Sequence, residues 1–135
     1  MSARGKARKL ALDFLYESDL RAKSAVELLN ERGTGEISQG EYVGQLLIGV
    51  LEHRTKIDEI ITTYAEGWDL DRMPSVDRNI LRIAIYEVLW ETELDDQVAV
   101  SQAIELAQEL STDDSAKYVN GVLGRIIALK STFAL

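Results

Sequence analysis

Apolar residues recur at intervals of three and four along almost the whole chain, and this period constrains the fold more than any other feature of the sequence. No segment alternates apolar and polar residues for long, and the single proline, Pro74, leaves long stretches uninterrupted. Residues three and four apart share one face of an α-helix, whereas a half-buried strand buries every second residue. The sequence therefore predicts an all-α protein.

Breaks in the periodic pattern divide it into about seven predicted helices. They cover residues 5–20, 24–33, 38–53, 55–67, 74–90, 97–110 and 114–129. Two capping boxes, Ser24-x-x-Glu27 and Ser38-x-x-Glu41, indicate where the second and third helices begin. The segment 74–90 is apolar around nearly its whole circumference, so we expect it to be central and buried.

The pair Asn120-Gly121 is a common hairpin turn, but its apolar neighbours repeat at helical spacing, so we predict a helix there. Gly121 and Gly124 each then cost about 1 kcal/mol relative to alanine. We expect a neighbouring helix to pack closely against them, and against Gly44 and Gly49 in the third helix.

The length of 135 residues fits one domain, and its charge is unevenly distributed. The net charge is −8, yet the arm formed by residues 1–9 holds four basic residues and no acid. A basic arm on an acidic body suggests a polyanion partner for the arm and a basic protein partner for the body. The alternative is a solvated tail on a body whose acids only keep it soluble.

The sequence lacks the residues that several kinds of metal and catalytic site require. The chain has no cysteine and one histidine, His53, so a Cys/His metal site is impossible and a reducing cytoplasm is expected. The sequence has no Glu-x-x-His pair, which a di-iron bundle requires, and no G-x-S-x-G nucleophile elbow of a serine hydrolase. The most apolar stretch, residues 80–90, is too short to span a bilayer. We expect a cytoplasmic protein that is not an enzyme and has no catalytic residue, metal, cofactor or membrane partner.

Two pairs of a cation and an aromatic residue could bind nucleic acid. Arg8 and Tyr16 lie two turns apart on the first predicted helix, and Lys117-Tyr118 lies near the start of the last. Basic side chains neutralise phosphates, and a tyrosine can stack on an unpaired base. The alternative is that these tyrosines belong to the core, as most tyrosines at helical spacing do.

Two longer motifs carry a resemblance to a known family. DRMPSVDRNILRIAIYE at residues 71–87, and ELA at 105–107 followed by DDSAKYVNGVL at 113–123, resemble the signatures of the NusB family of transcription antitermination factors. The resemblance implies an all-helical fold of two small packed bundles. It also implies a protein that pairs with the ribosomal protein NusE and binds boxA-like single-stranded nascent RNA, within an RNA polymerase antitermination complex that supports ribosomal RNA synthesis.

The predicted site residues follow from this resemblance and from the basic arm. The RNA-binding candidates are Arg4, Lys6, Arg8, Lys9, Tyr16, Asp114, Lys117 and Tyr118. The candidates facing NusE are Asp71 and Asp77. Asp77 falls in the first turn of the helix 74–90, where the helix dipole favours a carboxylate. We expect it to be available to a basic partner and to contribute little to stability.

Two alternatives remain open at this point. Because Gly5 interrupts the basic run, the chain could be a protein-interaction module that has lost RNA binding. It could also be an accessory domain related to ribosomal RNA methyltransferases, although the sequence ends at Leu135, soon after the last predicted helix, and we expect no cofactor domain. The sequence leaves the oligomeric state and the preferred RNA sequence open.

Overall fold

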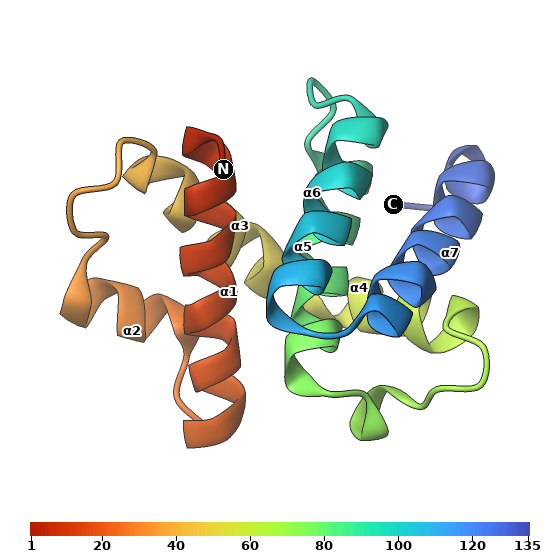
Figure 1. Cartoon of the computed structure of the whole chain (residues 1–135), viewed down its shortest axis with the longest axis horizontal. Coiled ribbons are helices and arrows are strands. Elements are labelled where there is room, and N and C mark those ends of the chain that lie inside the picture. Colours follow the sequence, from red (N-terminus) through yellow and green to blue (C-terminus); the bar gives the residue numbers. More distant parts are fainter. The chain divides into compact units, whose positions relative to one another are not determined.

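Seven α-helices and two short 3₁₀ helices make up the computed structural model, which describes residues 1–135 (Figure 1). The α-helices are α1 (Ala3–Arg21), α2 (Ala25–Arg32), α3 (Gly40–Glu52), α4 (Arg54–Tyr64), α5 (Ser75–Trp90), α6 (Asp96–Leu110) and α7 (Asp113–Leu129), and the 3₁₀ helices are η1 (Leu70–Arg72) and η2 (Lys130–Thr132). No strand is present. The predicted all-α class and the number of helices are therefore confirmed.

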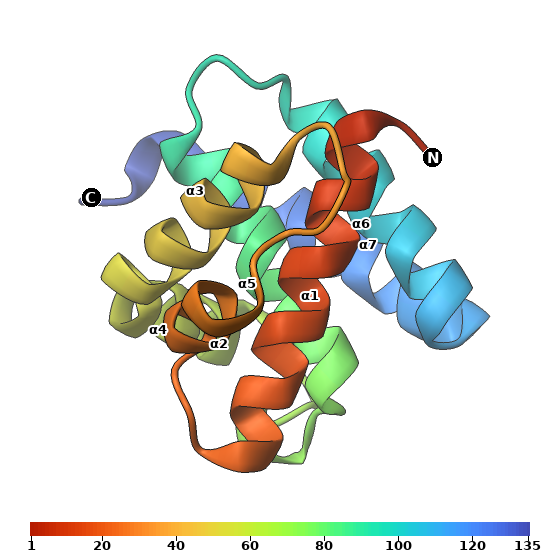
Figure 2. The same ribbon diagram turned by 90° about the vertical axis from the view of Figure 1, so that its left-hand side faces the viewer.

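The chain divides into two compact units, Met1–His53 and Arg54–Leu135. In the first unit α1 packs against α2 and α3, and α2 also packs against α3 (Figure 2). Its core consists of Ala7, Ala11, Leu12, Phe14, Leu15, Ala25, Leu28, Tyr42, Val43, Leu46, Leu47 and Val50. The hydroxyl of Ser2 caps α1 by accepting a hydrogen bond from the Gly5 N–H at 2.9 Å, so the helix begins before residue 5.

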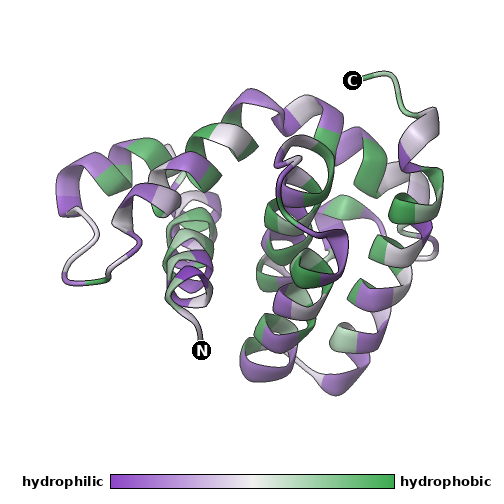
Figure 3. Ribbon diagram, turned by 90° about the horizontal axis from the view of Figure 1, so that it is seen from above, coloured by the Kyte–Doolittle hydropathy of each residue, from purple (hydrophilic) through white to green (hydrophobic).

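The second unit is built around α5. This helix packs against α4, α6 and α7, and twelve of its sixteen residues are buried. Helices α6 and α7 also pack against each other. Most helices carry hydrophobic residues on part of their circumference and hydrophilic residues on the rest (Figure 3). The prediction that residues 74–90 form a central, buried helix is confirmed.

A buried ion pair joins α4 to α5 in the second unit. The Arg82 guanidinium donates from Nε to Asp58 Oδ1 at 2.9 Å and from Nη2 to Asp58 Oδ2 at 3.0 Å. A third bond runs from Arg82 Nη1 to Asn79 Oδ1 at 3.0 Å. The Arg82 side chain is only 4% exposed. An arginine on this largely buried helix is therefore accommodated by a carboxylate partner that accepts two hydrogen bonds from it.

Both capping-box predictions were wrong. Ser24 precedes α2 but makes no capping hydrogen bond with its side chain. Ser38 lies in a turn, and α3 begins only at Gly40, because residues 33–39 form a loop in which Gly33 and Gly35 adopt positive φ. A serine and a glutamate at capping-box spacing therefore do not form the box in either case.

The expected close packing against glycine is also wrong at Gly121, Gly124 and Gly44. A Cβ atom on Gly121 or Gly124 would meet nothing within 4 Å, and one on Gly44 would make an ordinary contact. A close approach occurs instead at Gly40, where a Cβ would come within 2.5 Å of Thr34 Oγ1. The glycines of α7 lie on its exposed face, so packing does not explain them.

An exposed ion-pair network links α1 to α2. Glu17 accepts from Arg32 Nη1 at 2.6 Å and from Arg21 Nη1 at 2.8 Å. The hydrogen bond from Arg32, with the nearby positive charges, lowers the Glu17 pKa to about 2 from its usual 4.5. Lys23 and Glu31 form a second pair close by.

We expect the Glu17 pair to stabilise the first unit above about pH 4.5 and to be lost as the pH falls from 4.5 toward 2. The sign follows because the carboxyl group binds its proton more weakly in the folded chain than in the unfolded one. Urea unfolding of the wild type and of Glu17→Gln at pH 7 and pH 3 measures the effect. The stability difference between the two proteins should shrink at pH 3, and an equal difference at both pH values would contradict this role.

None of the helices is both long enough and apolar enough to cross a membrane.

Candidate nucleic-acid interface

The basic arm is helical rather than a loose tail. Residues 3–9 form the first two turns of α1, with Arg4 and Lys6 exposed and Lys9 partly exposed. The alternative of a solvated tail therefore does not describe this segment, because helix formation fixes the directions in which its cations project.

Two arginines of the arm pack on one aromatic ring. The guanidinium carbon of Arg4 lies 4.4 Å from the Tyr42 ring centroid, and that of Arg8 lies 5.7 Å from it. Arg8 is only 2% exposed. This burial places the Arg8 guanidinium out of reach of a phosphate, so the predicted RNA contact of Arg8 does not fit its position. Arg4 stays exposed while Tyr42 holds its guanidinium by a cation–π contact.

The two lysines of the basic arm share a face of α1 with an exposed aromatic residue. Lys6, Lys9, Asp13 and Tyr16 follow one another at helical spacings of three and four, and we call them the α1 stripe. Tyr16 is 40% exposed, so it is not a core residue. Asp13 is an acid that the sequence reasoning missed here. Burial raises its pKa, while the charge of Lys9 lowers it.

The start of α7 carries the second group of predicted residues. The Thr112 hydroxyl caps the helix by accepting from the Ser115 N–H at 3.0 Å. Asp114 and Lys117 are exposed, and Tyr118 is half-buried. The cap fixes the helix start from which these three side chains project.

Tyr118 is held in place by the loop that follows α4. Its hydroxyl donates to the Glu66 carbonyl oxygen at 3.1 Å, and its ring meets the Trp68 ring nearly at right angles, with the centroids 5.0 Å apart. Partial burial raises the pKa of the Tyr118 hydroxyl. The ring is therefore neither a core residue nor a freely rotating surface group.

Asp77 is not at the surface, which corrects the expectation that it is available to a partner. Its side chain is 1% exposed, and its Oδ2 accepts from the Ser115 hydroxyl at 2.8 Å. The other carboxylate oxygen, Oδ1, is buried without a hydrogen-bond partner. The carboxylate thus joins the first turn of α5 to the first turn of α7. Its burial arises because α7 packs over the start of α5, which the sequence of α5 alone could not reveal.

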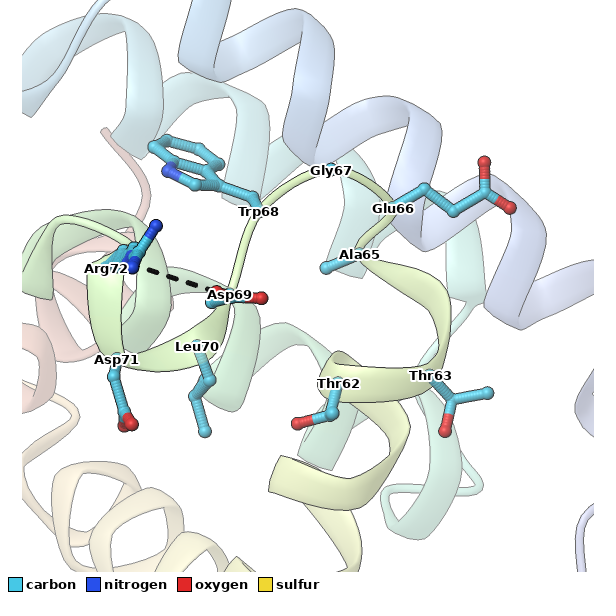
Figure 4. Close-up of a pocket in the computed structure, with 10 residues that line it drawn as sticks. All are labelled: Thr62, Thr63, Ala65, Glu66, Gly67, Trp68, Asp69, Leu70, Asp71 and Arg72. Atoms are coloured by element: carbon cyan, nitrogen blue, oxygen red, sulfur yellow. Dashed lines mark ion pairs between the residues drawn. The ribbon is translucent and has the colours of Figure 1, made fainter.

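Asp71 lies on a groove lined by residues 62, 63 and 65–72, which we call the acidic groove. It encloses about 760 Å³, and Figure 4 shows Leu70 and Asp71 on one side of the loop, with Trp68 projecting from the other. Three acids line it, Glu66, Asp69 and Asp71, against one cation, Arg72. Trp68 was missed by the sequence reasoning, although a lone tryptophan after the glycine of a loop was a usable signal.

Comparisons with known proteins all point to one family. The model of the NusB family matches residues 5–128. A transcription antitermination protein NusB from Nocardioides sp. is 48% identical over 135 residues, which are 99% of this chain and 100% of that protein. The corresponding protein from Acidothermus cellulolyticus is 52% identical over 133 residues, covering 98% of this chain and 92% of its own length. These names agree with the prediction that the chain is not an enzyme.

Solved structures agree at the level of the fold. NusB from T. maritima superposes with a TM-score of 0.87 at 32% identity, covering 95% of this chain and 92% of that one. A chain from a crystal structure of the antitermination factors NusB and NusE in complex with dsRNA gives a TM-score of 0.82 at 28% identity, with 95% and 98% coverage. The family model, the relatives and the shared fold together show that this chain belongs to the NusB family.

Proposed function

We propose that this chain is a transcription antitermination factor that pairs with the ribosomal protein NusE and binds boxA-like nascent RNA. It would act in the cytoplasm, as part of an RNA polymerase antitermination complex that supports ribosomal RNA transcription. The observation that carries the proposal is the family match over residues 5–128, together with a solved relative whose structure contains NusB, NusE and dsRNA.

The RNA-facing residues are two groups that each combine a cation with an accessible tyrosine. One is the α1 stripe with Lys6, Lys9 and Tyr16, and the other is the start of α7 with Lys117 and Tyr118. The cations supply sequence-independent attraction to phosphates. The tyrosines supply flat surfaces on which unpaired bases stack, which favours a single-stranded target over a duplex.

The NusE-facing surface is the acidic groove with Asp71. An excess of carboxylates attracts a basic partner and steers its approach. The half-exposed ring of Trp68 adds apolar area of the kind that anchors protein interfaces. Asp77 supports this half of the molecule from inside and makes no contact with the partner. The relatives above are named antitermination proteins and are matched over nearly their whole length, which gives no support to the methyltransferase alternative.

We expect Tyr118→Ala to weaken RNA binding by about 1–3 kcal/mol, the usual worth of one stacked base. Tyr118→Phe keeps the ring and should retain most of the affinity, although it loses the hydrogen bond to the Glu66 carbonyl. Fluorescence anisotropy with a labelled boxA-like RNA measures the affinity, and circular dichroism checks that both variants fold. Wild-type affinity in a folded Tyr118→Ala protein would remove Tyr118 from the interface.

A further inference from the structure

One tight turn after α4 holds the Tyr118 ring at two points. The turn runs from Ala65 to Trp68 and is closed by a hydrogen bond from the Trp68 N–H to the Ala65 carbonyl oxygen at 3.3 Å. Gly67 has φ +79°, the left-handed value that the third position of a type II turn requires. The turn therefore presents the Glu66 carbonyl and the Trp68 ring together, and both contact Tyr118.

A second contact fastens the same turn to α7. Arg125 Nη1 lies 3.2 Å from Glu66 Oε2. Arg125 is seven residues after Tyr118, which is about two helical turns, so both residues lie on one face of α7. The turn thus lies along α7, and Glu66 attaches it to that helix at two points. The Glu66 side chain pairs with Arg125, and the Glu66 carbonyl oxygen accepts from the Tyr118 hydroxyl.

The angle between the two rings decides what Trp68 can do for a bound base. The interplanar angle between Trp68 and Tyr118 is 85°. A base stacked flat on Tyr118 is parallel to that ring and therefore nearly perpendicular to the indole, so Trp68 cannot stack on the same base. What the indole does provide is an edge-to-face contact that limits the orientations open to the tyrosine ring.

We propose that Trp68 is a positioning residue for RNA binding, which acts by holding the Tyr118 ring in the orientation that receives a base. The proposal rests on the proposed function, because it assumes that Tyr118 faces RNA. A ring held before binding loses less conformational entropy when the base stacks, so affinity is higher than for a freely rotating tyrosine. The turn from Ala65 to Trp68 also lines the acidic groove, so it belongs both to the proposed RNA site at Tyr118 and to the proposed NusE-facing surface.

The test is a double-mutant cycle in the full chain with the variants Trp68→Ala, Tyr118→Ala and both together. Edge-to-face aromatic contacts are worth roughly 0.5–1.5 kcal/mol, so Trp68→Ala should weaken binding of a boxA-like RNA about two- to twelvefold. The double variant should bind no more weakly than Tyr118→Ala alone, because Trp68 acts only through that ring. Trp68→Phe, which keeps an aromatic edge, should restore most of the affinity.

Each of the other outcomes of the double-mutant cycle contradicts a different part of the proposal. If Tyr118→Ala weakens binding and Trp68→Ala leaves it unchanged, Trp68 does not position the ring. If the two losses multiply in the double variant, Trp68 acts on RNA independently of Tyr118. If Tyr118→Ala itself has no effect, the proposed RNA site at Tyr118 fails, and the positioning role fails with it.

A spectroscopic measurement covers the case in which Trp68→Ala does not fold. The chain has two tryptophans, Trp68 and Trp90, so Trp90→Phe leaves Trp68 as the only indole. In that background, saturating RNA should change the emission of Trp68, and the added substitution Tyr118→Phe should preserve the change. An emission spectrum that RNA leaves unaltered at saturation would contradict the binding of a base at the ring that Trp68 contacts.

Discussion

Asp58→Ala is expected to destabilise the second unit by about 3 kcal/mol. The substitution removes the carboxylate to which the buried Arg82 guanidinium donates two hydrogen bonds, and breaking a buried ion pair costs roughly 3–5 kcal/mol. We expect the lower end of that range because the Asp58 side chain is still 24% exposed and Asn79 continues to accept from Arg82. Urea unfolding followed by circular dichroism measures the change.

The matched control is Asp96→Ala, which breaks an ion pair of similar length in the same unit. Lys130 Nζ lies 3.0 Å from Asp96 Oδ1, but the two side chains are 37% and 26% exposed. Solvent screens such a pair, so we expect a loss of about 1 kcal/mol or less. Equal losses for the two variants would contradict the buried character of the pair between Asp58 and Arg82.

Asp77→Lys is expected to cost about 4 kcal/mol or more, a large part of the roughly 5–15 kcal/mol that stabilises an ordinary domain. The substitution places an ammonium group where a fully buried carboxylate accepts from Ser115, near the starts of α5 and α7. Burial of an unpaired charge and repulsion by two helix dipoles act in the same direction. The midpoint of urea unfolding measures the effect.

Asp77→Asn provides the control of similar shape. Its amide oxygen can still accept from Ser115, and the loss of charge near the helix termini should cost only about 1 kcal/mol. If Asp77→Lys instead unfolded with the wild-type midpoint, the carboxylate would lie at the surface in solution. That result would restore the position that the sequence alone suggested for it.

Helical period and composition were sufficient to predict the class of the fold and the place of its central helix. The predicted segments agree with α1, α2, α4, α5, α6 and α7 to within three residues, because apolar residues repeat there at helical spacing. The start of α3 was wrong, since two glycines and a turn before Gly40 override the serine signal at Ser38. Local capping motifs compete with loop geometry, and the sequence does not reveal which prevails.

Part of the candidate site could be predicted from residue type and spacing. Lys6, Tyr16, Lys117 and Tyr118 were identified by residue type and spacing, and each keeps some exposure. Arg8 and Asp77 were misjudged because a charged residue at a helix start reads as exposed until the packing around it is known. Glu66 and Trp68 lie 52 and 50 positions before Tyr118 in the sequence, and no local pattern encodes contacts over such a separation.

The measurement that tests the central claim most directly is the affinity for a boxA-like single-stranded RNA, with and without purified NusE, at low and moderate salt. We predict weak binding by the chain alone, with a log–log salt slope of about −2 if the exposed cations of α1 neutralise three phosphates. NusE should strengthen that binding. An RNA affinity that NusE leaves unchanged would contradict the proposed pairing with NusE. NusE binding with no RNA binding under any condition would contradict the proposal and indicate a protein-interaction module that has lost its RNA site.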